Sequence, residues 1–201
     1  MTETFRDRER DLDRLLTFVD AVVAIAITLL VLPLTEVAGE VGSSSVGDLL
    51  RANEDKLLGF LLSFLVIAQL WFAQHRILGG LVVQDPLVTR LLLAWTLTIV
   101  FLPFPTALVA DVGRDPATKV LYIGTMTVSS ALLGLMSWAV GRDRALRDTD
   151  HRPDPVPSVA TVLGFVLALT MSLALPALSY YPLLLLLLTG PVVGRWRRRR
   201  A

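Results

Sequence analysis

Long apolar stretches that contain almost no charge constrain the fold of this chain more than any other feature. Only 18% of its 201 residues are charged, against about 25% in a typical globular domain, and 54% are hydrophobic. The charged residues gather in a few short segments, as expected when lipid is the solvent for the stretches between them. An α-helix satisfies its backbone hydrogen bonds internally and therefore suits such stretches. The sequence predicts an all-α membrane protein.

Six stretches are apolar enough to be transmembrane helices. They cover residues 15–34, 57–78, 91–110, 120–140, 159–178 and 182–196. A helix needs about 20 residues to cross a hydrocarbon core of about 30 Å, and the first five stretches meet that length. The sixth is short: either the membrane is thinner there, or the helix is oblique, or Trp196 at the membrane interface completes it. We predict a single transmembrane domain over residues 1–201, with a Gly/Ser-rich loop and the charged segment RANEDK (residues 51–56) between the first two helices.

Basic residues are distributed unequally between the two sides of this arrangement. Six spans place Arg51, Lys56, Arg114 and Lys119 on one side, and the other 15 of the 19 Lys and Arg residues on the side of both termini. Cytoplasmic loops carry the excess of basic residues, so both termini are predicted to be cytoplasmic. The first 14 residues carry charges of both signs, unlike a signal peptide, and we expect the first span to be retained.

A single charged residue, Asp20, lies inside the first span. An intramembrane carboxylate is costly unless it is paired, so a partner is expected. In the predicted topology Trp71 and His75 lie at the same depth as Arg14 and Asp20, and their spacing of four residues places both on one helical face. Two interpretations stay open: Asp20 reaches the membrane boundary as a cap, or it joins a polar network that pins two helices together.

The first span also carries a continuous stripe made of Ile25, Thr28, Leu29 and Leu32. Their spacing of i, i+3, i+4 and i+7 places them on one face of a helix. Because the whole span is apolar, this periodicity does not distinguish a lipid-facing or packing surface from the wall of a pore.

Signatures of enzymes and cofactor sites do not occur in the chain. It has no HExxH motif, no Gly-rich phosphate loop followed by Lys-Ser/Thr, no paired intramembrane carboxylates and no cysteine. We therefore expect neither enzymatic activity nor a cofactor. The terminal RWRRRR (residues 195–200) could bind anionic lipid or nucleic acid, but a topogenic anchor for the last span explains it more simply, and no nucleic-acid partner is expected.

Three segments, taken in order, resemble the sequence pattern of one known family. RLLTFVD (residues 14–20), followed by AVVAIAITLLVLPL, resembles an opening signature Arg-x-x-x-Phe-Ser-Asp, and FLVIAQLWFAQHR (residues 64–76) resembles a Trp-x-x-x-His pattern. LPFPTALVA (residues 102–110) is close to the end of a third helix. This pattern is similar to that of the transmembrane protein 175 family, which comprises bacterial and endolysosomal potassium channels.

The resemblance implies a homotetramer in which the first helix of each subunit lines a central pore. Ile25, Leu29 and Leu32 would form an apolar constriction, with Thr28 beside them as a polar contact. The function implied is a potassium-permeable, weakly selective cation channel of a bacterial plasma membrane, with lipid and K⁺ as its partners.

The resemblance also implies a structural network that holds the first helix to its neighbour. Its members would be Arg14, Phe18, Asp20, Trp71 and His75. Val19 stands where the family has serine, so one hydrogen bond of that network is expected to be missing. Two alternatives to a channel remain, a proton-coupled secondary transporter that uses Asp20 and His75, and a non-conducting membrane scaffold.

Overall fold

The computed structural model describes residues 2–39, 45–81, 85–112, 115–143, 146 and 156–174. Nearly all of these residues are helical, as the sequence predicts. In chain order the helices are α1 (Thr2–Leu29), α2 (Leu32–Gly39), α3 (Val46–Ala52), α4 (Glu54–Leu78), α5 (Pro86–Phe101), α6 (Pro103–Val112), α7 (Pro116–Arg142) and α8 (Val156–Ala174).

Four helical segments are long and apolar enough to cross a membrane. They are Arg10–Glu36, Glu54–Leu78, Pro86–Val109 and Pro116–Arg142, and they coincide with the first four predicted spans. The shorter α8 stands in the place of the fifth span. Residues 175–178 of that span and the whole sixth span lie outside the described residues.

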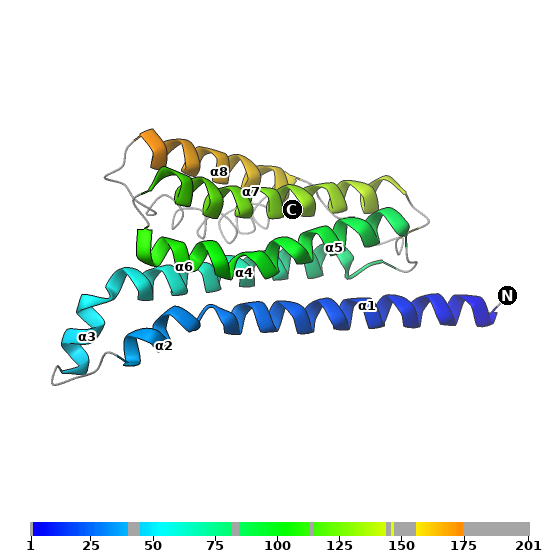
Figure 1. The fold of residues 1–201 in the computed structure, drawn as a ribbon. Helices are drawn as coiled ribbons and strands as arrows, with labels where there is room; N and C mark the ends of the chain where they lie inside the picture. The colour runs from blue at the N-terminus through cyan, green and yellow to red at the C-terminus, as the bar shows by residue number, and fades with distance from the viewer. Residues whose placement is uncertain are drawn as a thin grey trace, which may run out of the picture.

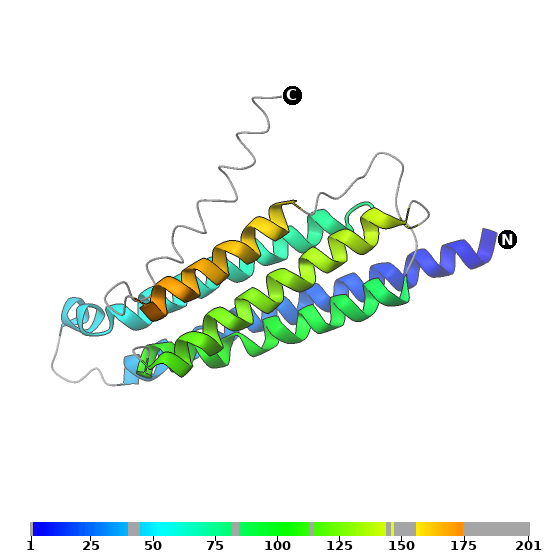
Figure 2. The same ribbon diagram turned by 90° about the horizontal axis from the view of Figure 1, so that it is seen from above.

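The long helices run side by side along one common direction (Figure 1 and Figure 2). In Figure 1, α1 lies at one edge and α8 at the opposite edge, with α4, α5, α6 and α7 between them. α1 packs mainly against α5, and α7 packs against both α5 and α8. The N-terminal end of α1 projects beyond the other helices (Figure 2).

Aspartate and proline residues define where several helices begin. Asp85 accepts a hydrogen bond from the backbone N–H of Val88 (2.9 Å) and Asp115 accepts one from that of Thr118 (3.3 Å). A proline follows each of these caps in the first turn, where its missing N–H costs nothing. Pro103, by contrast, lies within the third span and separates α5 from α6, because it has no N–H to continue the helical pattern.

One segment predicted as a charged loop is largely helical. Residues 51–56 belong to the end of α3 and the start of α4, with Asn53 between the two helices. Ser45 caps α3 by accepting from the backbone N–H of Asp48 at 3.2 Å, and Arg51 lies 3.6 Å from the Asp48 carboxylate. A cap and an i,i+3 ion pair stabilise a short helix that hydropathy alone does not indicate.

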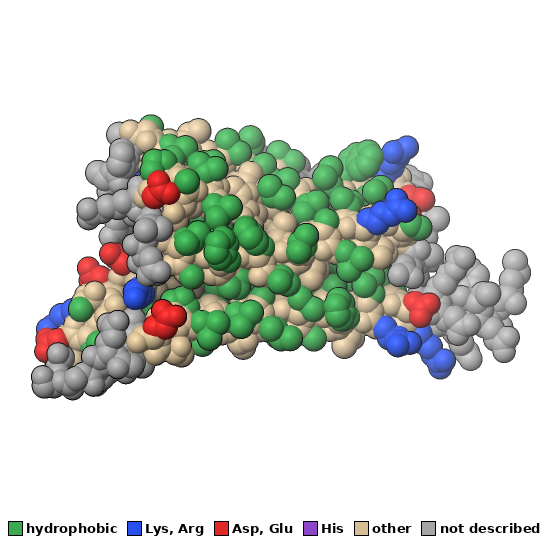
Figure 3. Space-filling view, in the orientation of Figure 1, with side chains coloured by type: hydrophobic (Ala, Val, Ile, Leu, Met, Phe, Trp, Pro, Cys, Tyr) green, Lys and Arg blue, Asp and Glu red, His purple; other side chains and the backbone are tan. Residues whose placement is uncertain are grey.

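The chain is apolar both inside and over much of its outer surface. Trp95, Tyr122, Ile67 and Leu30 are among its largest fully buried side chains and come from different segments of the bundle. Figure 3 shows hydrophobic side chains across the middle of the visible face, with Lys, Arg, Asp and Glu toward its two ends. This distribution is typical of a protein whose central band faces lipid.

Candidate functional site

The first helix has two apolar faces, and only one of them is covered. Val19, Val23, Ala26 and Leu30 are at most 2% exposed and belong to the buried core. Their spacing of three or four residues places them on one side of α1, which packs mainly against α5. Within the 18-residue apolar stretch of this span only 22% is buried, against 33% to 44% in the corresponding stretches of the other three spans. The first span is therefore the least covered of the four.

The predicted stripe lies on the uncovered face of this span. Ile25 is 60% exposed, Leu32 is 54% exposed and Leu29 is 40% exposed, and Thr28 is exposed with them. The Thr28 hydroxyl donates to the backbone carbonyl of Ile25 at 2.7 Å, which leaves its oxygen lone pairs available. We call Ile25, Thr28, Leu29 and Leu32 the open stripe.

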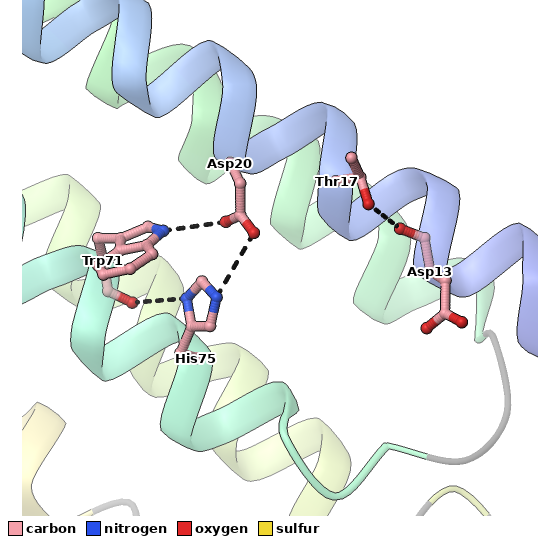
Figure 4. A network of polar contacts seen from close by, with 5 residues as sticks. All are labelled: Asp13, Thr17, Asp20, Trp71 and His75. Atoms are coloured by element: carbon pink, nitrogen blue, oxygen red, sulfur yellow. Dashed lines mark hydrogen bonds and ion pairs between the residues drawn. The ribbon is translucent and has the colours of Figure 1, made fainter.

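A polar contact joins α1 to α4 (Figure 4). The indole N–H of Trp71 donates to Asp20 Oδ1 at 2.9 Å, and His75 Nε2 lies 3.5 Å from Asp20 Oδ2. The Trp71 and His75 rings lie one helical turn apart, with their centroids separated by 4.3 Å. We call these three residues the polar anchor. The structure brings them together as the matched depths predict.

The polar anchor lies at the edge of the chain. The side chains of Asp20 and His75 are 38% and 43% exposed, so the contact between them contributes little on its own. The indole hydrogen bond is the stronger contact, because its donor and acceptor are 2.9 Å apart, whereas His75 Nε2 lies 3.5 Å from the same carboxylate. Since α1 contacts α4 much less than it contacts α5, the polar anchor is a large part of what joins α1 to α4.

Two residues of the predicted network do not reach the polar anchor. Among the described residues, Arg14 makes no hydrogen bond or ion pair with Asp20, Trp71 or His75, and its side chain is exposed. Phe18 is exposed as well. Both residues therefore lie on the uncovered side of α1 in a single chain, and their part in the network implied by the resemblance stays a prediction.

Val19 occupies a different environment from the one that the resemblance implies. Its side chain is fully buried among apolar neighbours. Successive residues of a helix point about 100° apart, so Val19 faces the core while Asp20 faces α4. The missing serine hydroxyl therefore does not interrupt the contact between Asp20 and Trp71, and valine fits its apolar surroundings.

Two buried polar contacts lie outside the sequence-based predictions. Lys119, which directly precedes the predicted fourth span, is buried, and its Nζ donates to the backbone carbonyl of Ser172 in α8 at 3.0 Å. Ser63 Oγ lies 3.0 Å from Thr106 Oγ1 and 2.7 Å from the Tyr122 hydroxyl, linking α4, α6 and α7. Isolated hydroxyls in apolar helices give no local signal of such contacts.

The described residues contain no group of three or more His, Cys, Asp or Glu side chains arranged to hold a metal ion. The chemistry that the site offers does not depend on such a group. It presents an apolar helix face with one hydroxyl, held at a fixed orientation by a polar contact to the next helix. Such a face can border a water-filled path or pack against another protein surface.

Comparisons with known proteins agree on one family. The family described as "Endosomal/lysosomal potassium channel TMEM175" matches residues 14–103. A potassium channel from Streptomyces collinus is 30% identical over 158 residues, which cover 77% of this chain and 75% of that protein.

A solved structure shows the same fold. The crystal structure of a lysosomal potassium-selective channel TMEM175 homolog from Chamaesiphon minutus matches with a TM-score of 0.62 and 24% sequence identity. The match covers 90% of this chain and 98% of that chain. The helical arrangement described above is therefore shared with that protein.

Proposed function

The chain belongs to the TMEM175 family of potassium channels, and we propose that it forms a homotetrameric, potassium-permeable and weakly selective cation channel. The observation that carries this proposal is the open stripe, which lies on α1 and the first residue of α2. Four copies of α1 around a symmetry axis would turn this exposed surface into the wall of a pore. The proposed permeant ion is K⁺, and no cofactor takes part.

The polar anchor supports a covered rather than a lipid-exposed environment for this edge of the chain. Asp20 and His75 lie within or beside the membrane spans and are each more than a third exposed in the single chain. A carboxylate that faces hydrocarbon is costly, so such groups usually face protein or water. A neighbouring subunit or an aqueous pathway on this side of α1 would provide that environment.

The composition of the open stripe suits a constriction that lacks fixed charge. Rings of Ile25, Leu29 and Leu32 side chains would gate by excluding water, and Thr28 would add a ring of hydroxyl oxygens. Potassium gives up its hydration water more readily than sodium does. A narrow apolar passage therefore favours K⁺ modestly, which accounts for weak selectivity.

The proposed orientation follows the distribution of basic residues. Arg10, Arg14, Arg76, Arg90 and Arg142 are all exposed in the structure. They belong to the side of the membrane that carries 15 of the 19 basic residues. By the positive-inside rule this side, which includes both termini, is cytoplasmic. The proposed location of the chain is the plasma membrane of a bacterial cell.

The decisive experiment is the reversal potential of the purified protein in a planar bilayer with K⁺ on one side and Na⁺ on the other. We expect a current that reverses toward the potassium potential, and a tetramer in mild detergent. A folded tetramer without current would favour the scaffold. Saturable transport with a fixed proton stoichiometry would favour the transporter.

A further inference from the structure

The open stripe is one part of a longer line of exposed side chains on α1. Going back toward the N-terminus from Ile25 in steps of four and three, the residues are Ala21, Phe18, Arg14 and Asp11, and all of them are exposed. Alternating steps of four and three keep side chains on one side of a helix. The uncovered face therefore continues past the apolar stripe, toward the end of α1 that projects beyond the other helices (Figure 2).

Phe18 is the largest apolar side chain on this line. It is 58% exposed, close to the 60% of Ile25. Seven helical residues make two turns less about 20°, so the two side chains point in nearly the same direction. At a rise of about 1.5 Å per residue they are about 10 Å apart along the helix axis. A tetramer that places Ile25 around a pore therefore places four Phe18 side chains around the same axis, nearer the N-terminus.

Phenyl rings around a pore differ chemically from the aliphatic side chains of the open stripe. The face of an aromatic ring attracts cations, and quaternary ammonium ions are the ligands for which proteins use such rings most. Aliphatic side chains offer no such attraction. Arg14, four residues before Phe18, opposes cations, but Asp11 carries the opposite charge three residues further on, so the two together are neutral. Phe18 is therefore the group on this line that suits an organic cation.

We propose that the four Phe18 side chains form an aromatic ring at the cytoplasmic entrance of the pore, and that this ring binds organic cations of the quaternary ammonium class. The inference rests on the proposed tetrameric pore and on the proposed cytoplasmic N-terminus. Tetraethylammonium carries its charge inside an apolar shell of fixed size, so a constriction at Ile25 would stop it. Held at Phe18, it would block the K⁺ current from the cytoplasmic side.

Block by tetraethylammonium in excised inside-out membrane patches tests the site, because the bath then contacts the cytoplasmic side. The readout is the tetraethylammonium concentration that halves the K⁺ current. We expect Phe18→Leu, which has no ring, to raise this concentration by about tenfold, and Phe18→Tyr to change it by less than about threefold. Phe72→Leu is the matched control, because Phe72 is 59% exposed but lies on α4 beside Trp71, and its effect should stay below about twofold.

A second readout does not depend on the affinity of the blocker. The chain contains no cysteine, so Phe18→Cys provides a single site for a thiol reagent. A cationic thiol reagent applied from the cytoplasmic side should reduce the K⁺ current of Phe18→Cys and leave that of Phe72→Cys unchanged. A K⁺ current that cytoplasmic tetraethylammonium does not block, block that Phe18→Leu leaves unchanged, or equal responses of the two cysteine variants would overturn the site while leaving the channel intact. Absence of K⁺ current from the unsubstituted tetramer would instead remove the proposed function, and this inference with it.

Discussion

Trp71 and Asp20 are joined across the boundary between α4 and α1, with 2.9 Å between the indole nitrogen and the carboxylate oxygen. Successive side chains of a helix are rotated by about 100° around its axis, so the angle between the Asp20 side chain and those of the open stripe on α1 is fixed. This contact therefore fixes the rotation of α1 about its own axis. It helps to keep Ile25, Thr28 and Leu29 on the uncovered face of α1.

Removing the indole donor should weaken this attachment. Trp71→Phe keeps an aromatic ring beside His75 but loses the hydrogen bond to Asp20, so we expect the free energy of unfolding to fall by about 1–2 kcal/mol. Thermal unfolding in detergent measures the change. Trp138→Phe is the matched control, because Trp138 is exposed on α7, and its effect should stay within about 0.5 kcal/mol. Equal losses in both variants would contradict the role given to Trp71.

Asp20→Ala should affect assembly before it affects permeation. The variant removes the acceptor of both contacts of the polar anchor, so α1 loses its defined rotation and the subunits lose a defined interface. We expect a lower yield of tetramer by size-exclusion chromatography with light scattering. The tetramers that do form should keep the K⁺ over Na⁺ preference of the unsubstituted protein. Full tetramer yield with an altered ion preference would assign Asp20 to the conduction path instead.

Ile25→Asn should make the proposed constriction easier to hydrate. A polar side chain on the open stripe lowers the barrier that an apolar ring presents to water, so conductance should rise and the preference for K⁺ over Na⁺ should fall. Bi-ionic reversal potentials and single-channel conductance measure both effects. Leu97→Asn on α5 is the control, because Leu97 is also highly exposed in the single chain but lies on another helix. Unchanged current in Ile25→Asn would remove this residue from the pore.

Val19→Ser restores the residue of the family signature and tests whether this position needs a hydroxyl. Because Val19 is fully buried among apolar side chains, we expect a loss of about 1–2 kcal/mol in the free energy of unfolding. The loss should lie near the lower end of this range, since the hydroxyl of a helical serine can donate to a backbone carbonyl of the preceding turn. Ion selectivity should not change. A gain in stability would show that the hydroxyl finds a partner that the described contacts lack.

Lys119→Met tests the attachment of α8 to α7. The methionine retains most of the apolar stem but removes the amine that donates to the Ser172 carbonyl. We expect faster hydrogen exchange of backbone amides in the last turn of α8, and a loss of about 1–2 kcal/mol in the free energy of unfolding. Lys119→Arg, which keeps a donor and a positive charge, should recover part of the protection. Identical exchange in Lys119→Met and the unsubstituted protein would contradict this role.

Local sequence determined the class of the protein and the positions of its first four spans. A span requires about 20 consecutive apolar residues, and this property can be read along the chain without knowing what packs against what. The boundaries of α4 and α7 consequently lie within a few residues of the predicted spans. The proximity of Asp20, Trp71 and His75 could also be predicted from the sequence. Charged and polar residues are rare within spans, and these three lie at the same predicted depth in the membrane.

Tertiary structure decided which surfaces are covered. Almost every residue of the first span is apolar, so its sequence has no contrast that separates the buried face of Val19 and Val23 from the open face of Ile25 and Leu29. Packing against α5 and the contact of Asp20 with Trp71 on α4 make that distinction. The burial of Lys119 likewise depends on a carbonyl 53 residues away, a distance in sequence at which no local pattern carries information.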